Sequence, residues 1–116
     1  MAYFDISVAA APTDGKDAYI AFAQKVGKIF REHGALQVID TWGDDIPDGQ
    51  VTDFKKAVAL KDGETVAVGW ITWPDKATRD AAWAVLMDPE GPMSGLDMPF
   101  DGKRMIFGAF DTIAES

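Results

Sequence analysis

The chain begins with a strictly alternating stretch. From residue 3 to residue 10, apolar side chains occupy every second position and more polar ones lie between them. One face carries Phe4, Ile6, Val8 and Ala10, and the other carries Tyr3, Asp5 and Ser7. A period of two is typical of a β-strand. The pattern therefore predicts a strand over residues 3–10, ended by Pro12.

The pattern then changes to a helical period. From residue 16 to residue 33, apolar side chains recur three or four positions apart, opposite a charged face. This predicts a helix over residues 16–33. Asp14 is expected to accept from its first free amides, and Gly34 to end it in a left-handed conformation. His33, the only histidine, is expected to cap its end; the alternatives are a single base or an axial haem ligand.

The rest of the chain alternates between strand-like and helix-like stretches. Strands are predicted over residues 36–42, near 52–60, over 64–73 and over 104–110, with a helix that ends near residue 87. Asp62-Gly63 is a strong hairpin turn, and Pro74-Asp75 breaks the chain and caps the second helix. There is no internal repeat or linker, so residues 1–116 are predicted to form a single domain.

This order of elements predicts an α+β, ferredoxin-like sandwich with an antiparallel sheet and two helices. In that arrangement the helices cover only one face of the sheet. The strand over residues 64–73 is nevertheless apolar on both faces. A second copy packed sheet to sheet would cover the exposed face, which predicts a homodimer that encloses a barrel-like space. The competing explanation is that the hairpin or the segment 93–100 folds over that face.

Composition and charge narrow the classes of partner. The chain has no cysteine, which excludes disulfides and thiolate chemistry and is typical of a reducing compartment. Its net charge is −8 and it has no basic run, so nucleic acid is not an expected partner. Neither a signal peptide nor an apolar run of bilayer length is present. A cytoplasmic protein that does not interact with membranes is expected.

Two aspartates inside predicted strands are the main candidates for chemistry. Asp5 and Asp40 lie between apolar neighbours, where Asp is disfavoured. Arg104 opens a strand expected to neighbour the first one. The functional interpretation is a polar wall in the dimer cavity, where a buried Asp acts as a base. The structural alternative is an Asp–Arg pair or an edge-exposed Asp. The candidate ligand-binding residues are Tyr3, Asp5, Asp40, Trp42, Trp70 and Arg104.

No metal or cofactor is expected from the remaining motifs. With one histidine and no cysteine, a cluster of such ligands is excluded. The acidic loop that begins at Asp44 has Ile46 and Lys55 where an EF-hand needs its third and twelfth oxygen ligands. No phosphate-binding glycine motif or nucleophile elbow is present.

Several longer stretches resemble a known family. They are the run over residues 97–106 (DMPFDGKRMI) and the shorter runs His33-Gly34-Ala35, Trp42-Gly43-Asp44-Asp45 and Thr52-Asp53-Phe54. Together they resemble the small bacterial YbaA-like family of unknown function, over residues 3–110. The resemblance implies the dimeric α/β-barrel superfamily, which has a ferredoxin-like fold. Ile6 and Ala109 stand where that family usually has glycine, which would narrow a cavity between the sheets.

The resemblance supplies no catalytic residue, because the family has no established activity. Its superfamily includes cofactor-independent monooxygenases, isomerases, stress-response dimers and haem enzymes. Three hypotheses follow: a homodimer that binds a small molecule in a cavity, a cofactor-independent monooxygenase or isomerase acting on a small organic substrate, and a structural or stress-related dimer without a ligand. Fold alone does not decide among them, and the sequence does not decide whether the protein is an enzyme.

Overall fold

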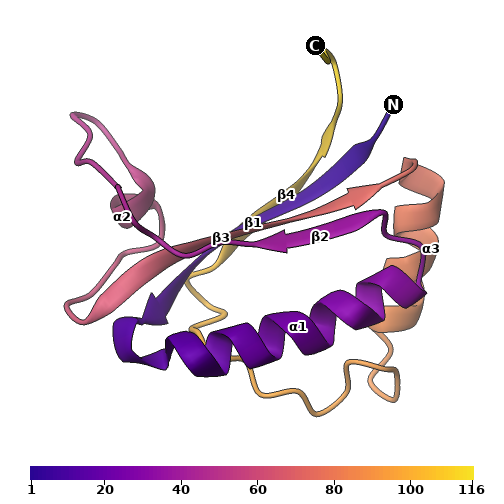
Figure 1. Cartoon of the computed structure of the whole chain (residues 1–116), viewed down its shortest axis with the longest axis horizontal. Helices are drawn as coiled ribbons and strands as arrows, with labels where there is room; N and C mark the ends of the chain where they lie inside the picture. Colours follow the sequence, from indigo (N-terminus) through magenta and orange to yellow (C-terminus); the bar gives the residue numbers. More distant parts are fainter.

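A four-stranded antiparallel sheet forms the centre of the molecule (Figure 1). The computed structural model describes all of residues 1–116. Its strands are β1 (Tyr3–Pro12), β2 (Gln37–Asp40), β3 (Glu64–Trp73) and β4 (Ile106–Asp111). Its helices are α1 (Lys16–Glu32), α2 (Phe54–Ala57) and α3 (Lys76–Leu86), and a 3-10 helix, Thr13–Gly15, joins β1 to α1. The predicted α+β class is confirmed.

The strands lie in the order β2-β3-β1-β4, so the first strand of the chain is an inner one. β1 pairs with β3 over its whole length and with β4 over its first half. Phe4, for example, lies between Thr72 of β3 and Phe110 of β4. Beyond β4, the Thr112 hydroxyl donates to the Ala2 carbonyl, which extends this contact.

Helices α1 and α3 cover one face of the sheet (Figure 1). The core between them surrounds Trp73, whose side chain is completely buried. The ring of Phe30 from α1 meets Trp73 edge-on, with 6.2 Å between ring centroids. Val26 of α1 and Leu86 of α3 complete the same cluster. Burying each such side chain contributes roughly 1.5–3 kcal/mol, which holds the helices against the sheet.

The opposite face is covered at one end only. Residues 43–61, between β2 and β3, form an excursion that contains α2 and lies on this side of the sheet (Figure 1). Its buried Val58 packs on Val8, Ala10 and Val66. The rest of this face remains uncovered, and we call it the open sheet face. Its apolar side chains are Phe4, Ile6, Ile39, Val68, Trp70, Ile106 and Phe110.

The segment between α3 and β4 runs on the helix side, as Figure 1 shows in orange. Met93 and Leu96 pack on the core between α1 and α3. Phe100 meets Tyr19 and Phe22 of α1, with ring centroids 5.9 Å apart in both pairs. This segment therefore does not cover the open sheet face. The alternative in which residues 93–100 fold over that face is wrong.

Local structure differs from the prediction most clearly in the excursion. The strand expected near residues 52–60 does not form, because Asp53 starts a short helix there. Its carboxylate accepts from the Lys56 backbone amide at 2.7 Å. As a result, β2 and β3 pair as neighbours without a tight hairpin between them. β4 begins at Ile106, so Arg104 lies just outside it.

The predicted caps have mixed outcomes. Gly15 rather than Asp14 is the N-cap of α1, and no side chain accepts from its first amides. At the other end, His33 Nδ1 lies 2.8 Å from the Ile29 carbonyl, which confirms its capping role. Gly34 follows with a φ of +107°, the left-handed conformation expected there. Asp75 caps α3 by accepting from the Thr78 amide at 2.7 Å.

Candidate functional site

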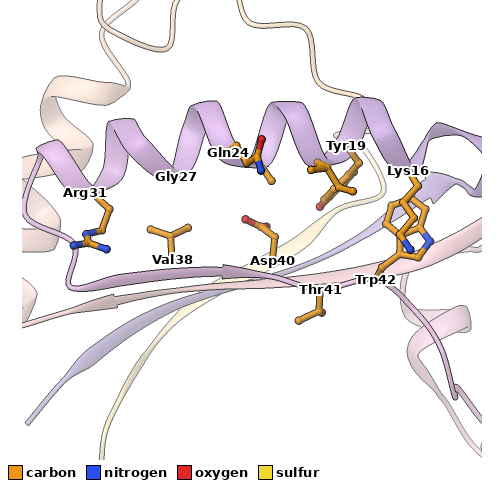
Figure 2. A pocket seen from close by; sticks show the side chains of 11 residues that line it. Lys16, Tyr19, Gln24, Gly27, Arg31, Val38, Asp40, Thr41 and Trp42 are labelled. Atoms are coloured by element: carbon orange, nitrogen blue, oxygen red, sulfur yellow. The ribbon is translucent and has the colours of Figure 1, made fainter.

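A groove runs between α1 and the edge strand β2 (Figure 2). Its volume is about 520 Å³, which lies within the range of about 300–1,000 Å³ typical of small-molecule sites. Five of its lining residues are hydrophobic and the others are polar, charged or glycine. The lining residues are Lys16, Tyr19, Ile20, Ala23, Gln24, Gly27, Arg31, Val38, Asp40, Thr41 and Trp42.

The strand side of the groove is set by the alternation of β2 and the residues after it. Asp40 and Trp42 lie on the face that looks toward α1, while Thr41 points away from it (Figure 2). The Thr41 hydroxyl donates to the Val68 carbonyl at 2.6 Å. Pairing with β3 continues past β2, because the Gly43 amide donates to the Val66 carbonyl at 2.8 Å. This pairing fixes the backbone on both sides of Trp42.

In its observed rotamer, Asp40 occupies space that a glycine beside it in β3 leaves free. Gly69 lies directly opposite Asp40 in the sheet. A Cβ atom at Gly69 would come within 2.6 Å of Asp40 Oδ1, closer than real Cβ atoms approach other atoms. The carboxylate thus lies over the backbone of β3 and extends into the groove (Figure 2).

The helix side is set by the spacing of residues on α1. The lining positions recur three or four residues apart, so they share one face of the helix. Gly27 faces Val38 of the strand, and a Cβ there would lie 3.6 Å from Val38 Cγ1, which is an ordinary van der Waals contact. Near the start of α1, the Tyr19 ring meets the Trp42 ring edge-on at 5.4 Å between centroids. The groove therefore has an aromatic end near Tyr19 and an Arg31 end beyond Gly27 (Figure 2).

The ionisable groups in the groove are perturbed by their surroundings. Partial desolvation raises the pKa of Asp40, because loss of surrounding water disfavours its charged form, although the residue remains exposed at the groove. Burial, and secondarily the charge of Asp40, raises the pKa of Tyr19 to about 12. Tyr19 is therefore a neutral hydroxyl at physiological pH, available as a hydrogen-bond donor or acceptor.

Five polar side chains of the groove have no partner within the protein, whereas the Thr41 hydroxyl has one. Lys16, Tyr19, Gln24, Arg31 and Asp40 make no side-chain hydrogen bond or ion pair with another residue. Elsewhere in the molecule the charged side chains near the core are paired. The groove thus offers two cations, one carboxylate, an amide and a hydroxyl to whatever enters it.

Asp5, in contrast, is enclosed in a satisfied network away from the groove. Its carboxylate accepts from Trp73 Nε1 at 2.9 Å, from Trp83 Nε1 at 2.8 Å and from Arg79 Nη2 at 2.8 Å. Arg79 Nε lies 3.1 Å from each of its oxygens. Donors from three side chains thus contact both carboxylate oxygens, so the structure places Asp5 in a structural pair. The partner is Arg79, not the Arg104 expected from the sequence.

The other predicted site residues lie in separate places. Arg104 donates to Glu64 at 2.7 and 2.8 Å and to Asp101 at 2.8 Å, at the far end of the sheet from Asp5. Tyr3 packs on the core beneath the helices, and Trp70 lies on the open sheet face. Of the six predicted residues, only Asp40 and Trp42 line the groove, on the helix side of the sheet.

Sequence reasoning missed the residues that α1 contributes to the groove. Lys16, Tyr19, Gln24 and Arg31 line it with Asp40. Tyr19 belongs to the recognised apolar stripe, but the stripe alone does not show which strand it meets. No other feature of the sequence points to this strand.

Two general findings limit the classes of site. No helix is long and apolar enough to span a membrane. No three or more Asp, Glu or His side chains come together in a way that would hold a metal ion.

Comparison with known proteins gives a family resemblance along nearly the whole chain. Residues 2–102 match the model of a family described as "Protein of unknown function (DUF1428)". Similar proteins are the "Uncharacterized protein YbaA" of Escherichia coli strain K12, of Escherichia coli O157:H7 and of Shigella flexneri. Each is 47% identical over 116 residues, and the match covers 99% of both chains. The YbaA-like resemblance expected from the sequence motifs is confirmed.

Proposed function

The chain belongs to the DUF1428 family of unknown function, and from the geometry of its groove we propose that it binds a small organic molecule between α1 and β2. The observation that carries this proposal is the set of five polar side chains that line a groove of about 520 Å³ without partners in the protein. Apolar walls with a few convergent polar groups are what small-molecule sites use.

We also propose that the protein acts as a homodimer through the open sheet face. The strand order is that of a ferredoxin-like sandwich, whose sheet has one face free of helices. Here that face carries seven apolar side chains, of which Ile106 and Phe110 are 45% and 53% exposed. A contiguous apolar surface of this kind favours self-association, and twofold pairing is the commonest form. Two sheets packed face to face would form a dimeric α/β barrel.

The groove and the open sheet face lie on opposite sides of the sheet. Each copy in such a dimer would therefore carry its own binding groove, facing away from its partner. This differs from the sequence-based hypothesis of a ligand between the two sheets.

Blocking the groove tests the binding proposal. Ala23 lines the groove, whereas Ala21 is exposed on the same helix outside it. We expect Ala23→Phe to fill the groove and to abolish binding, while Ala21→Phe leaves binding unchanged. The measurement is a screen of small metabolites by thermal shift, with native mass spectrometry to detect bound molecules.

Circular dichroism of both variants provides the control for folding. Binding that survives Ala23→Phe would place the ligand elsewhere, and a screen that yields no ligand for the wild-type protein would contradict the proposed function.

A further inference from the structure

The charges of the groove determine what kind of ligand complements it. Asp40 is the only anionic side chain among the lining residues. It has no ion pair, and although the residue is exposed, its carboxylate is partly desolvated by the groove. A carboxylate in this position gains from a cationic hydrogen-bond donor, because charge-assisted hydrogen bonds are stronger than neutral ones. The ligand group opposite Asp40 is therefore expected to be an ammonium or a similar cation.

The aromatic end of the groove has a single cation. Lys16 is the first residue of α1 and lies one helical turn before Tyr19, whose ring contacts Trp42. Asp14 and Asp17 neighbour Lys16 in the sequence but do not line the groove. Arg31 is at the other end of the groove, beyond Gly27 (Figure 2). An anionic group bound at the aromatic end would therefore meet Lys16.

An aromatic surface lies between these two charges. Trp42 is only partly buried, so part of its indole faces the groove. Tyr19 contacts the edge of this ring, and Ile20 and Ala23 add apolar surface from α1. A flat aromatic ring packs well on such a surface, since offset and edge-on ring contacts add to the gain from burial.

We propose that the groove binds a zwitterionic aromatic molecule of the aromatic amino acid class. Its ammonium group would bind Asp40, its carboxylate would bind Lys16, and its ring would lie against Trp42 and Tyr19. This inference rests on the proposed function and adds the chemical class of the ligand. It requires one positive and one negative group on the same molecule as the ring.

A matched series of indole compounds tests the class by isothermal titration calorimetry. L-Tryptophan carries both charged groups, tryptamine lacks the carboxylate, indole-3-propionate lacks the ammonium, and L-alanine lacks the ring. We expect L-tryptophan to bind at least about tenfold more tightly than each of the others, in line with the usual strength of one charge-assisted hydrogen bond. Equal affinity for L-tryptophan and either singly charged analogue would overturn the inference.

Variants assign each charged group to its residue. Asp40→Asn should weaken the binding of L-tryptophan and tryptamine about tenfold or more and leave the binding of indole-3-propionate unchanged. Lys16→Gln should weaken the binding of L-tryptophan and indole-3-propionate and leave the binding of tryptamine unchanged. The controls are Asp44→Asn and Lys25→Gln, which make the same changes in net charge outside the groove. If the variants weaken all three indoles equally, the proposed orientation is wrong.

The failure of this inference can be told apart from the failure of the proposed function. If L-tryptophan does not bind but the metabolite screen finds a ligand that Ala23→Phe excludes, the groove is a binding site and the zwitterion assignment is wrong. If no ligand of the groove is found at all, the proposed function itself is wrong.

Discussion

At the scale of single residues, two aspartates with similar sequence surroundings have opposite environments. Asp5 accepts from two indoles and a guanidinium, and its side chain is only 13% exposed. Asp40 has no partner in the protein and lies over Gly69 at the side of the groove. The Asp5 carboxylate therefore stabilises the fold, while the Asp40 carboxylate is free to bind a ligand.

This contrast predicts different costs for the same substitution. Asp5→Asn removes the charge opposite Arg79 and turns an amide donor toward groups that are already donors. We expect it to lower the free energy of unfolding by about 2–3 kcal/mol, as when one partner of a largely buried pair is removed. Asp40→Asn should change it by less than about 0.5 kcal/mol. Urea unfolding followed by fluorescence measures both.

The matched control for this comparison is Asp80→Asn, which affects an exposed pair on α3. Exposed ion pairs contribute about 0–1 kcal/mol, so its effect should be small. If Asp5→Asn were as harmless as Asp80→Asn, the network around Asp5 would not hold the fold together.

The sequence was sufficient to single out both aspartates but not their roles. The period of two places Asp40 and Trp42 on one face, and the groove brings them together. The partner of Asp5 is 74 positions away on α3, and its other two donors come from β3 and α3. Nothing local in the sequence specifies that pairing, which depends on how α3 crosses the sheet.

At the scale of elements, one arginine joins three segments at the far end of the sheet. Arg104 donates to Glu64 at the start of β3, to Asp101 and to the Ala59 carbonyl that follows α2. Both Arg104 and Glu64 are largely covered, with side chains 16% and 15% exposed. The pair thus connects the excursion to the segment that leads into β4.

This connection predicts a particular response to acid. Hydrogen bonds from the Arg104 side chain, and then from the Lys61 backbone amide, lower the pKa of Glu64 from 4.5 to about 2. A lowered pKa in the folded state means that the carboxylate adds stability above about pH 4.5 and that this stability is lost as the pH falls toward 2. We expect Glu64→Gln to reduce the free energy of unfolding by about 1 kcal/mol at neutral pH. The difference in this free energy between variant and wild type should become smaller as the pH falls.

Thermal unfolding of both proteins between neutral pH and pH values near 3 would reveal the narrowing. Asp62→Asn provides the control, because Asp62 is an exposed neighbour without side-chain contacts. A difference between Glu64→Gln and wild type that stays constant with pH would show that the pair does not contribute through its charge.

Periodic patterns predicted the long elements well and the short ones poorly. The strands β1 and β3 and the helices α1 and α3 each extend over ten or more residues, and each was expected close to its observed bounds. The four-residue helix α2 was taken for a strand, because so short a run has too few positions to reveal its period. The sequence feature that indicates this helix is the capping residue Asp53, which favours a helix start more strongly than the weak alternation favours a strand.

At the scale of the whole molecule, the two faces of the sheet are not equivalent. One is covered by α1, α3 and the segment that follows α3, and the other is covered only by the excursion. The open sheet face is therefore an apolar surface bounded at one end by folded chain. We expect a second copy to cover it and the excursion to limit how far the two sheets overlap.

A charge placed on this surface tests the dimer. Phe110 is 53% exposed in the single chain, so Phe110→Glu should leave the fold intact. In a dimer the same carboxylate would be buried without a partner, which costs several kcal/mol. By sedimentation equilibrium, we expect the wild-type protein to have twice the mass of one chain and Phe110→Glu to be a monomer. Val85→Glu, on the exposed side of α3, should remain a dimer.

A wild-type protein that stays monomeric at high concentration would contradict the sheet-to-sheet contact. Dissociation by both variants alike would indicate a different interface, one that includes α3.

The inner position of β1 has a consequence for how the protein is synthesised. β1 leaves the ribosome before both of its neighbours in the sheet, because β3 and β4 come from later parts of the chain. Until Phe110 can pair with Phe4, one edge of an apolar strand remains without its hydrogen-bonding partner. Closing so long a loop is slow, and an unpaired apolar strand is prone to aggregation while it waits. The nascent chain is therefore most prone to aggregation in the interval before β4 emerges.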